Sequence, residues 1–275
     1  MTVSAQSRPR PVALTIAGSD SGGGAGIQAD LKTFTALGVY GMSAITAVTA
    51  QNTVGVREAL VLEPDLVAAQ IDAVMEDIGC DAAKMGMLGN AEVVSVVAER
   101  IAAHGIPNLV VDPVMVAKSG DALLAEDAVQ AVIERLLPQA RLVTPNLPEA
   151  EVILGHQIEA KNMTDAARAL CEMGPAAAVV KGGHLAGPAL DVLYDAETGE
   201  LHELSAPRIE SRNTHGTGCT FSAAIAAFLA RGMRLVPAAR WAKRFVTAAI
   251  RRGLPLGEGH GPTDHIAAGR LFPGG

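Results

Sequence analysis

Residues 213–222 read Asn-Thr-His-Gly-Thr-Gly-Cys-Thr-Phe-Ser and combine the features of an anion-binding site. Gly216 and Gly218 flank Thr217 at the point where an apolar segment of helical composition begins. The start of a helix carries unpaired backbone N–H groups and a partial positive charge, and glycine lets the backbone approach a ligand closely. A phosphate group is therefore the ligand that we expect here.

Cys219 lies in the same stretch, at the expected start of the helix. A helix N-terminus favours the thiolate form of cysteine, so this residue is a candidate base or nucleophile near neutral pH. The alternative is a buried cysteine that begins a tightly packed helix.

Polar residues follow several of the expected strands. In open α/β sheets, ligands bind at the carboxyl ends of the strands, so we expect these residues to share one edge with the anion site. A single Asp112 or Asn146 could instead cap a helix. The residues at the strand ends are Gly18, Ser19, Asp20, Gln51, Asn52, Lys84, Asp112, Asn146, Glu149 and Lys181.

The glycine-rich segment 18–26 resembles two nucleotide-binding motifs but matches neither. Gly24, Gly26 and Ala29 have the spacing of a dinucleotide-binding turn, yet residues 31–57 contain no acidic residue to bind a ribose. A Walker A loop fails because Gly24 and Ala25 stand where Lys and Ser or Thr are required. We therefore reject both interpretations.

Apolar runs and helical periodicity alternate along the chain, which predicts an α/β fold with a mostly parallel central sheet flanked by helices on both faces. Residues 1–10 are expected to be a flexible tail, and residues 11–275 a single domain. The expected strands are 12–17, 41–51, 56–62, 82–85, 109–111, 141–144 and 177–181, with an edge hairpin over 190–194 and 201–205. The expected helices are 25–37, 65–79, 91–104, 121–137, 147–154, 164–173, 218–231 and 236–252.

Composition excludes several classes of protein. A hydrophobic content of 49% in 275 residues supports a large core, and the net charge of −7 argues against non-specific nucleic-acid binding. No segment approaches the roughly 20 apolar residues of a membrane span, and the first ten residues lack an apolar leader. Cys80, Cys171 and Cys219 are widely spaced, which indicates neither disulfides nor a zinc site. We expect a cytoplasmic protein.

Eight stretches of the chain, in order, resemble the hydroxymethylpyrimidine/phosphomethylpyrimidine kinases of thiamine biosynthesis, a family of the ribokinase-like superfamily. They are AGSDSGGGAGIQADLKT (17–33), TAVTAQNT (46–53), KMGML (84–88), VVDPVM (110–115), TPNLPEAE (144–151), VVKGGH (179–184), NTHGTGCTFSAA (213–224) and GHGPTDH (259–265). The combination of Gln51 and Cys219 carries the assignment to this subgroup. The resemblance implies a ribokinase-like fold and two ATP-dependent steps, which convert 4-amino-5-hydroxymethyl-2-methylpyrimidine to its monophosphate and then to its diphosphate.

The resemblance also implies roles for individual residues. Cys219 takes the place of the aspartate base of most ribokinase-like enzymes and acts as a base or positions the acceptor hydroxyl. Relatives suggest a homodimer that binds a small pyrimidine substrate, with no nucleic acid and no membrane. The implied sets are Gly216, Thr217 and Gly218 around the transferred phosphoryl group, Lys181 and Asn146 at the nucleotide, Asp112 and Glu149 at Mg²⁺, and Gln51, Asp30, Gly18, Met85 and Val114 at the pyrimidine.

Other interpretations stay open at this level. A pyridoxal or pyridoxine kinase on the same scaffold is the closest alternative, because its substrate is another flat heteroaromatic ring with a hydroxymethyl group. A thiol-dependent hydrolase that uses Cys219 with a histidine, and a non-catalytic pyrimidine sensor, are more distant ones. The Gln51 side chain could pair with the ring or satisfy the loop backbone. His184 and His215 are expected to be hydrogen-bonding loop residues.

Overall fold

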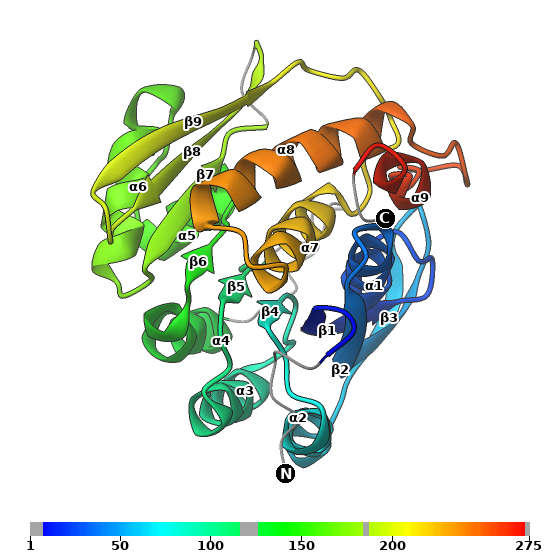
Figure 1. Ribbon diagram of the computed structural model, residues 1–275, viewed down its shortest axis with the longest axis vertical. Coiled ribbons are helices and arrows are strands. Elements are labelled where there is room, and N and C mark those ends of the chain that lie inside the picture. Colours follow the sequence, from blue (N-terminus) through cyan, green and yellow to red (C-terminus); the bar gives the residue numbers. More distant parts are fainter. Residues whose placement is uncertain (1–7, 116–125, 184–186, 273–275) are drawn as a thin grey trace.

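The computed structural model describes residues 8–115, 126–183 and 187–272. A nine-stranded sheet runs through this part of the chain, in the order β3-β2-β1-β4-β5-β6-β7-β8-β9 (Figure 1). The strands are β1 (Val12–Asp20), β2 (Tyr40–Gln51), β3 (Val56–Val61), β4 (Ala82–Met85), β5 (Leu109–Val111), β6 (Leu142–Val143), β7 (Ala177–Lys181), β8 (Ala189–Asp195) and β9 (Glu200–Ala206).

Six central strands are parallel to one another, in the order β2-β1-β4-β5-β6-β7, whereas β3 at one edge and β8 and β9 at the other pair antiparallel. The predicted mostly parallel sheet and its edge hairpin are confirmed. Because the parallel strands all point the same way, the residues that follow β1, β2, β4, β5, β6 and β7 meet at one edge.

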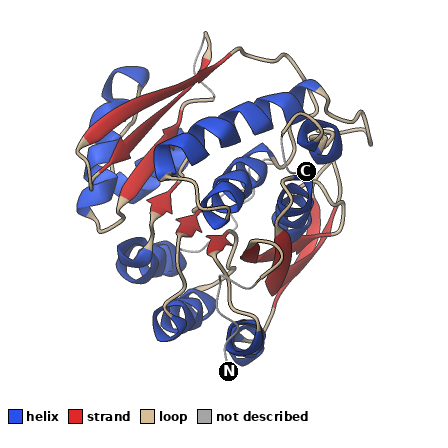
Figure 2. Cartoon of the chain, viewed as in Figure 1, coloured by secondary structure: helices blue, strands red, loops and turns tan. Residues whose placement is uncertain are grey.

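Helices cover both faces of the sheet, as Figures 1 and 2 show. One apolar core lies under α2 (Pro64–Asp77), α3 (Ala91–His104), α4 (Glu126–Ala131), α5 (Leu147–Leu154) and α6 (Met163–Glu172). A second core lies under α1 (Gly26–Ala36), α7 (Thr217–Ala230), α8 (Leu235–Arg251) and α9 (His265–Gly269). None of the helices in the described ranges is both long and apolar enough to cross a membrane.

Local sequence explains several helix ends. The side chain of Asn90 accepts the backbone N–H of Val93 at the start of α3, and Gly105 ends that helix with φ +56°. Asn146 caps α5 in the same way, and Gly155 ends it with φ +73°. These caps account for the agreement between the predicted and observed bounds of both helices.

Two regions differ from the prediction. The helix expected over 121–137 is only partly visible, because 121–125 lie outside the described residues, as do 1–7 of the expected tail. Its described part changes from α4 to the π-helical η2 (Val132–Leu136) and the 3₁₀ turn η3 (Leu137–Gln139), where Pro138 has no N–H to donate. The sequence prediction also missed the short 3₁₀ turn η4 (Ala160–Asn162) and α9, which are too short to show periodicity.

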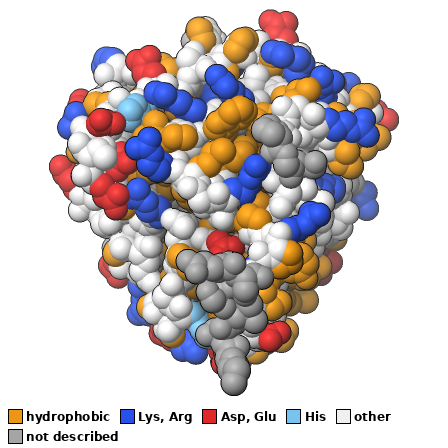
Figure 3. All heavy atoms as spheres, in the orientation of Figure 1, with side chains coloured by type: hydrophobic (Ala, Val, Ile, Leu, Met, Phe, Trp, Pro, Cys, Tyr) orange, Lys and Arg blue, Asp and Glu red, His pale blue; other side chains and the backbone are white. Residues whose placement is uncertain are grey.

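Lys and Arg side chains lie at the surface over α8, as Figure 3 shows. Arg240, Arg244 and Arg251 on α8 are exposed. Lys243 is different, because its Nζ lies 2.7 Å from Oδ2 of Asp191 and both residues are buried. This ion pair joins α8 to β8.

Candidate active site

The N-terminus of α7 has the geometry that the sequence predicted. Gly216 precedes the helix with φ +76°, and a Cβ atom there would collide with the carbonyl oxygen of Gly24. No side chain caps this fully described helix, and its first turn holds no acidic residue. The Thr217 hydroxyl donates to the carbonyl of Thr214, which fixes the turn before the helix. The helix start is therefore an uncapped, positive end packed against the loop that follows β1.

Lys181 and Asp112 lie directly beside this helix start. Nζ of Lys181 donates to Oδ1 of Asp112 at 2.8 Å, and the hydroxyls of Thr144 and Ser222 contact the same carboxylate at 3.2 Å each. A Cβ atom on Gly218 would stand 3.5 Å from Nζ of Lys181 and 3.7 Å from Oδ2 of Asp112. The Lys181 ammonium and the buried Asp112 carboxylate therefore lie together at the N-terminus of α7.

Lys181 and Asp112 each stabilise the charged form of the other. Burial alone would raise the pKa of Asp112, but Lys181 and then Lys84 bring the pKa of that carboxyl below its usual range. Burial would lower the pKa of Lys181, but Asp112 and Glu149 raise the pKa of that amine. Both groups are consequently charged at neutral pH, which suits the binding of an anion and a cation side by side.

Asn146 and Glu149 form a capping box at the start of α5. The Asn146 side chain accepts the backbone N–H of Glu149 at 2.9 Å, and the Glu149 carboxylate accepts the backbone N–H of Asn146 at 2.8 Å. Helix capping, the alternative for Asn146, is thus observed. Burial raises the pKa of Glu149 to about 7, although Lys181 acts in the opposite direction. Glu149 is therefore the carboxyl of this group that gains or loses a proton near neutral pH.

Cys219 is less acidic than the helix-dipole argument predicted. Burial raises the pKa of its thiol to about 11, and the nearby carboxylates of Asp30 and Asp112 add to this effect, whereas Lys84 opposes it. Desolvation is the largest of these effects, and the pKa favours the buried thiol over the activated thiolate at neutral pH. All three cysteines are free thiols. A protonated Cys219 can position a hydroxyl group but is a poor nucleophile.

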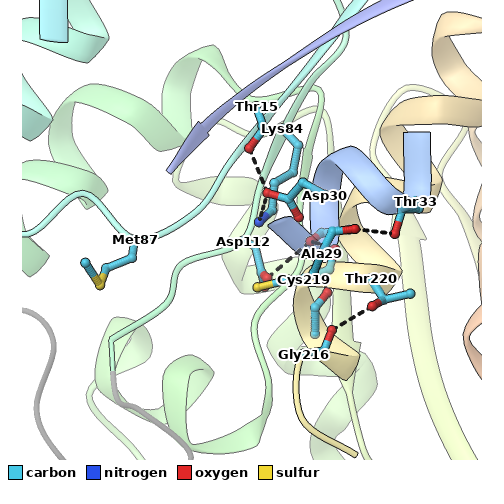
Figure 4. Close-up of polar contacts among 12 residues, drawn as sticks. Thr15, Ala29, Asp30, Thr33, Lys84, Met87, Asp112, Gly216, Cys219 and Thr220 are labelled. Atoms are coloured by element: carbon cyan, nitrogen blue, oxygen red, sulfur yellow. Dashed lines mark hydrogen bonds and ion pairs between the residues drawn. The ribbon is translucent and has the colours of Figure 1, made fainter. Parts of the chain in front are cut away.

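A fully buried polar network lies beside Cys219 (Figure 4). Asp30 on α1 accepts hydrogen bonds from Thr15 on β1 at 2.7 Å and from Lys84 on β4 at 2.9 Å. Lys84 was counted among the polar residues near the strand ends, but no role was assigned to it. The signal was available in the sequence, because a lysine inside the four-residue apolar strand Ala82–Met85 requires a buried acidic partner.

The structure corrects the methionine expected at the acceptor. Side chains alternate along β4, so Met85 packs into the core under α2 to α6, on the face opposite to Lys84 and the network around Asp30. Met87 is the methionine at the loop edge. The Gly18 N–H donates to the Met87 carbonyl at 3.1 Å, and a Cβ on Gly18 would stand 2.8 Å from the Met87 methyl group. Val114 is half-buried after β5.

Gln51 ends β2 next to the glycine-rich loop. Its backbone N–H and carbonyl both bond to the hydroxyl of Ser21, at 2.8 Å each. Its side-chain oxygen accepts the hydroxyl of Thr49 at 3.1 Å. In the described parts of the chain, the Gln51 side chain makes no hydrogen bond to loop backbone. The bond from Thr49 is the one that orients its amide group.

His215 hydrogen-bonds within the loops, as predicted, and its ring lies 2.9 Å from the carboxylate of Asp20. His184 lies outside the described residues. Across residues 8–115, 126–183 and 187–272 there is no cluster of three or more His, Cys, Asp or Glu side chains that could hold a metal ion. An ion at Asp112 and Glu149 would take its remaining ligands from water and nucleotide.

The central parallel sheet, the uncapped glycine-rich helix start and the Lys181–Asp112 pair at the strand ends define an α/β small-molecule kinase of the ribokinase-like class. The model of one family, phosphomethylpyrimidine kinase, matches residues 20–264, and the chain belongs to this family.

Curated and solved relatives agree with this membership. The chain is 53% identical to a hydroxymethylpyrimidine/phosphomethylpyrimidine kinase of Streptomyces coelicolor over 93% of this chain and 94% of that protein. It is also 53% identical to the thiamine biosynthesis bifunctional protein ThiED of Geobacter sulfurreducens, where the match covers 94% of this chain but 53% of that protein's length. The ADP complex of Bacillus subtilis pyridoxal kinase superposes with a TM-score of 0.88 at 41% identity, over 96% of this chain and 100% of that one.

Proposed function

We propose that this protein phosphorylates the hydroxymethyl group of 4-amino-5-hydroxymethyl-2-methylpyrimidine with ATP and then phosphorylates the resulting monophosphate, for thiamine biosynthesis. The observation that carries the proposal is the position of the Lys181–Asp112 pair at the N-terminus of α7. Phosphoryl transfer requires reactants to be positioned and their oxygen charges to be neutralised, and this group of residues supplies both. The 53% identity to curated kinases of this name supports the substrate.

On the nucleotide side, Lys181 contacts the ATP phosphates, and the backbone of Gly216, Thr217 and Gly218 surrounds the transferred group. Asn146 lies beside Lys181, because their backbones form an isolated bridge, and it completes this side. Asp112 and Glu149 would hold Mg²⁺. Two carboxylates within one electrostatic group fit an ion that prefers hard oxygen ligands and retains water. When bound, the ion neutralises phosphate charge.

On the acceptor side, Asp30, Gly18, Gln51 and Val114 contact the pyrimidine, and Met87 takes the place that was expected for Met85. In the first step a bond forms between the hydroxymethyl oxygen and the terminal phosphorus of ATP, while the bond from that phosphorus to the leaving ADP oxygen breaks. Because the transition state is loose, the hydroxyl proton leaves late and passes to an oxygen of the transferred phosphoryl group. Cys219, with its thiol protonated, positions this hydroxyl rather than attacking the substrate.

Pyridoxal phosphorylation is the second candidate function, and the structural likeness to a pyridoxal kinase supports it. The thiol-dependent hydrolase is disfavoured, since the pKa of Cys219 is about 11 and the neighbouring His215 is bonded to Asp20 instead. A hydrolase of this kind needs an activated thiolate.

Product analysis after incubation with the pyrimidine alcohol and excess MgATP tests the proposal. We expect the monophosphate first and the diphosphate later, each accompanied by one ADP. A parallel incubation with pyridoxal measures the second candidate. Turnover of pyridoxal without turnover of the pyrimidine would reverse the assignment, and binding of the pyrimidine without ADP formation would indicate a sensor.

The proposal includes the homodimer that the resemblance implies. Val48 on β2 and Leu60 on β3 are paired across the sheet edge, and both are exposed, at 46% and 65%. An apolar cross-strand pair at an exposed edge favours association between copies. Light scattering after size-exclusion chromatography measures the mass, and a monomer at micromolar concentration would contradict the dimer.

A further inference from the structure

Lys84 is a lysine whose side chain is entirely buried, with 0% exposure. It lies on β4 opposite Thr15 of β1 in the parallel register. A buried ammonium is costly unless it is paired and hydrogen-bonded. The partners that Lys84 contacts therefore decide what it can do.

Lys84 and Thr15 bind the same oxygen of Asp30. Nζ of Lys84 lies 2.9 Å from Oδ2, and the Thr15 hydroxyl donates to Oδ2 at 2.7 Å. Gly86 leaves room for this arrangement, because a Cβ atom there would stand 2.9 Å from Nζ of Lys84. Two donors from two different strands therefore fix the orientation of the Asp30 carboxylate.

The second oxygen of Asp30 is left available. Oδ1 is buried and has no hydrogen-bond partner among the residues that the structure describes. Figure 4 shows the Asp30 carboxylate on the same side as Asp112 and Cys219, and both Asp30 and Lys84 interact electrostatically with Cys219. An unpaired buried acceptor costs free energy in the empty protein, and a donor on the substrate recovers it.

We propose that Lys84 and Thr15 are positioning residues for the acceptor. They hold Oδ2 of Asp30 so that Oδ1 accepts a hydrogen bond from an O–H or N–H group of the bound alcohol. The ammonium of Lys84 also offsets the negative charge of Asp30 next to the transferred phosphoryl group. This inference rests on the proposed function for the position of the acceptor beside Asp30 and for the identity of the alcohol.

Thr15 offers a mild test, because Thr15→Val removes the hydroxyl and keeps the shape. We expect Thr15→Val to raise the Kd of the pyrimidine alcohol, measured by calorimetry without ATP, and its KM by about five- to tenfold, with the KM for ATP within about twofold. Thr15→Ser, which keeps the donor, should bind close to wild type. Thr33→Val is the matched control, since Thr33 is equally buried on α1 but donates to the carbonyl of Ala29.

Lys84→Met gives the stronger test, and Lys84→Met/Asp30→Asn accompanies it because the single variant leaves a buried carboxylate unpaired. We expect the single variant to lose at least tenfold in alcohol binding. The double variant should recover the thermal midpoint without recovering alcohol binding. ADP binding should stay within about twofold in every folded variant.

Two results would overturn the inference. One is an equal loss of alcohol and ADP binding in proportion to the loss of thermal midpoint, which would make the network purely structural. The other is unchanged alcohol binding in Thr15→Val and in the double variant. If the wild-type protein binds pyridoxal and not the pyrimidine, the proposed substrate is wrong, and the same variants measured with pyridoxal still decide the role of Lys84 and Thr15.

Discussion

Nε2 of His215 lies 2.9 Å from Oδ2 of Asp20, although the two residues are 195 positions apart in the chain. The Asp20 carboxylate also accepts the backbone N–H groups of Gly22, Gly24 and Ala25. Burial would raise the pKa of Asp20, but the bonds from His215 and Ala25 bring it below its usual range. One ionised carboxylate thus joins the loop after β1 to the loop that begins α7.

Loss of this link should disturb the anion-binding loop. We expect His215→Asn to lower the free energy of unfolding by about 1.5–3 kcal/mol, as for other hydrogen bonds to charged groups, and to lower kcat. Urea denaturation and steady-state kinetics measure the two effects. His202→Asn is the control, because His202 pairs with the exposed Glu200 on the surface. Equal effects of both substitutions would show that the link has no special role.

Removal of the Lys181 charge should weaken nucleotide binding selectively. Lys181→Met deletes the ammonium 2.8 Å from Asp112, so we expect the KM for ATP to rise by roughly tenfold or more while the Kd of the alcohol changes little. Lys161→Met, at a surface lysine paired with Glu159, should leave both constants unchanged. A normal KM for ATP in Lys181→Met would remove this residue from the nucleotide site.

The thiol of Cys219 should react slowly at neutral pH. Because burial raises its pKa to about 11, alkylation by iodoacetamide should accelerate steadily from pH 7 to pH 10 without a plateau. Peptide mass spectrometry follows the modification, and the unfolded protein, with a thiol pKa near 8.5, is the reference. We also expect Cys219→Ser to retain more turnover than Cys219→Ala, since a hydroxyl still positions the substrate. A rate that levels off below pH 8 would contradict a protonated thiol.

Gln51 should contribute to recognition of the pyrimidine ring. If its amide pairs with a ring nitrogen and the neighbouring amine, Gln51→Leu should weaken alcohol binding by about 1–3 kcal/mol. Calorimetry measures the change, and Gln130→Leu, at a side chain bonded to Glu134 on the surface of α4 and η2, is the control. Unchanged affinity in Gln51→Leu would assign this residue to the loop alone.

His265 should make the fold sensitive to acid. Burial lowers its pKa to about 4, and its Nε2 bonds to the Thr220 hydroxyl of α7 at 2.9 Å. Between pH 6.5 and pH 4 this histidine is protonated in the unfolded chain but neutral in the folded protein. The free energy of unfolding should therefore fall by up to about 3 kcal/mol as the pH falls through this range. His265→Gln should reduce this slope. The pH dependence of urea midpoints tests it, and equal slopes in both proteins would contradict the shift.

Local patterns were sufficient for most of the fold and for the polar residues at the strand ends. Apolar runs, helix caps and glycines act over a few residues, so α3, α5 and the β8–β9 hairpin could be located from the sequence. The uncapped helix start at Gly216 was equally visible, because a glycine pair before an apolar helix is itself a local signal. The irregular end of the helix after α4 and the short α9 were missed for the same reason, since short or irregular turns leave little periodicity.

The roles that depend on burial or on contacts distant in sequence were decided by the tertiary structure. The sequence left open whether Cys219 is an activated thiolate or a buried thiol, and desolvation in the folded protein raises its pKa to about 11. Met85 and Met87 are two positions apart, and only the packing of the sheet shows which of them reaches the Gly18 loop. The sequence alone determined the kinase fold and the site's edge. Chain topology decided which charges meet there. Asp30 and Lys84, like Asp20 and His215, come into contact only when α1 and α7 pack against the folded sheet.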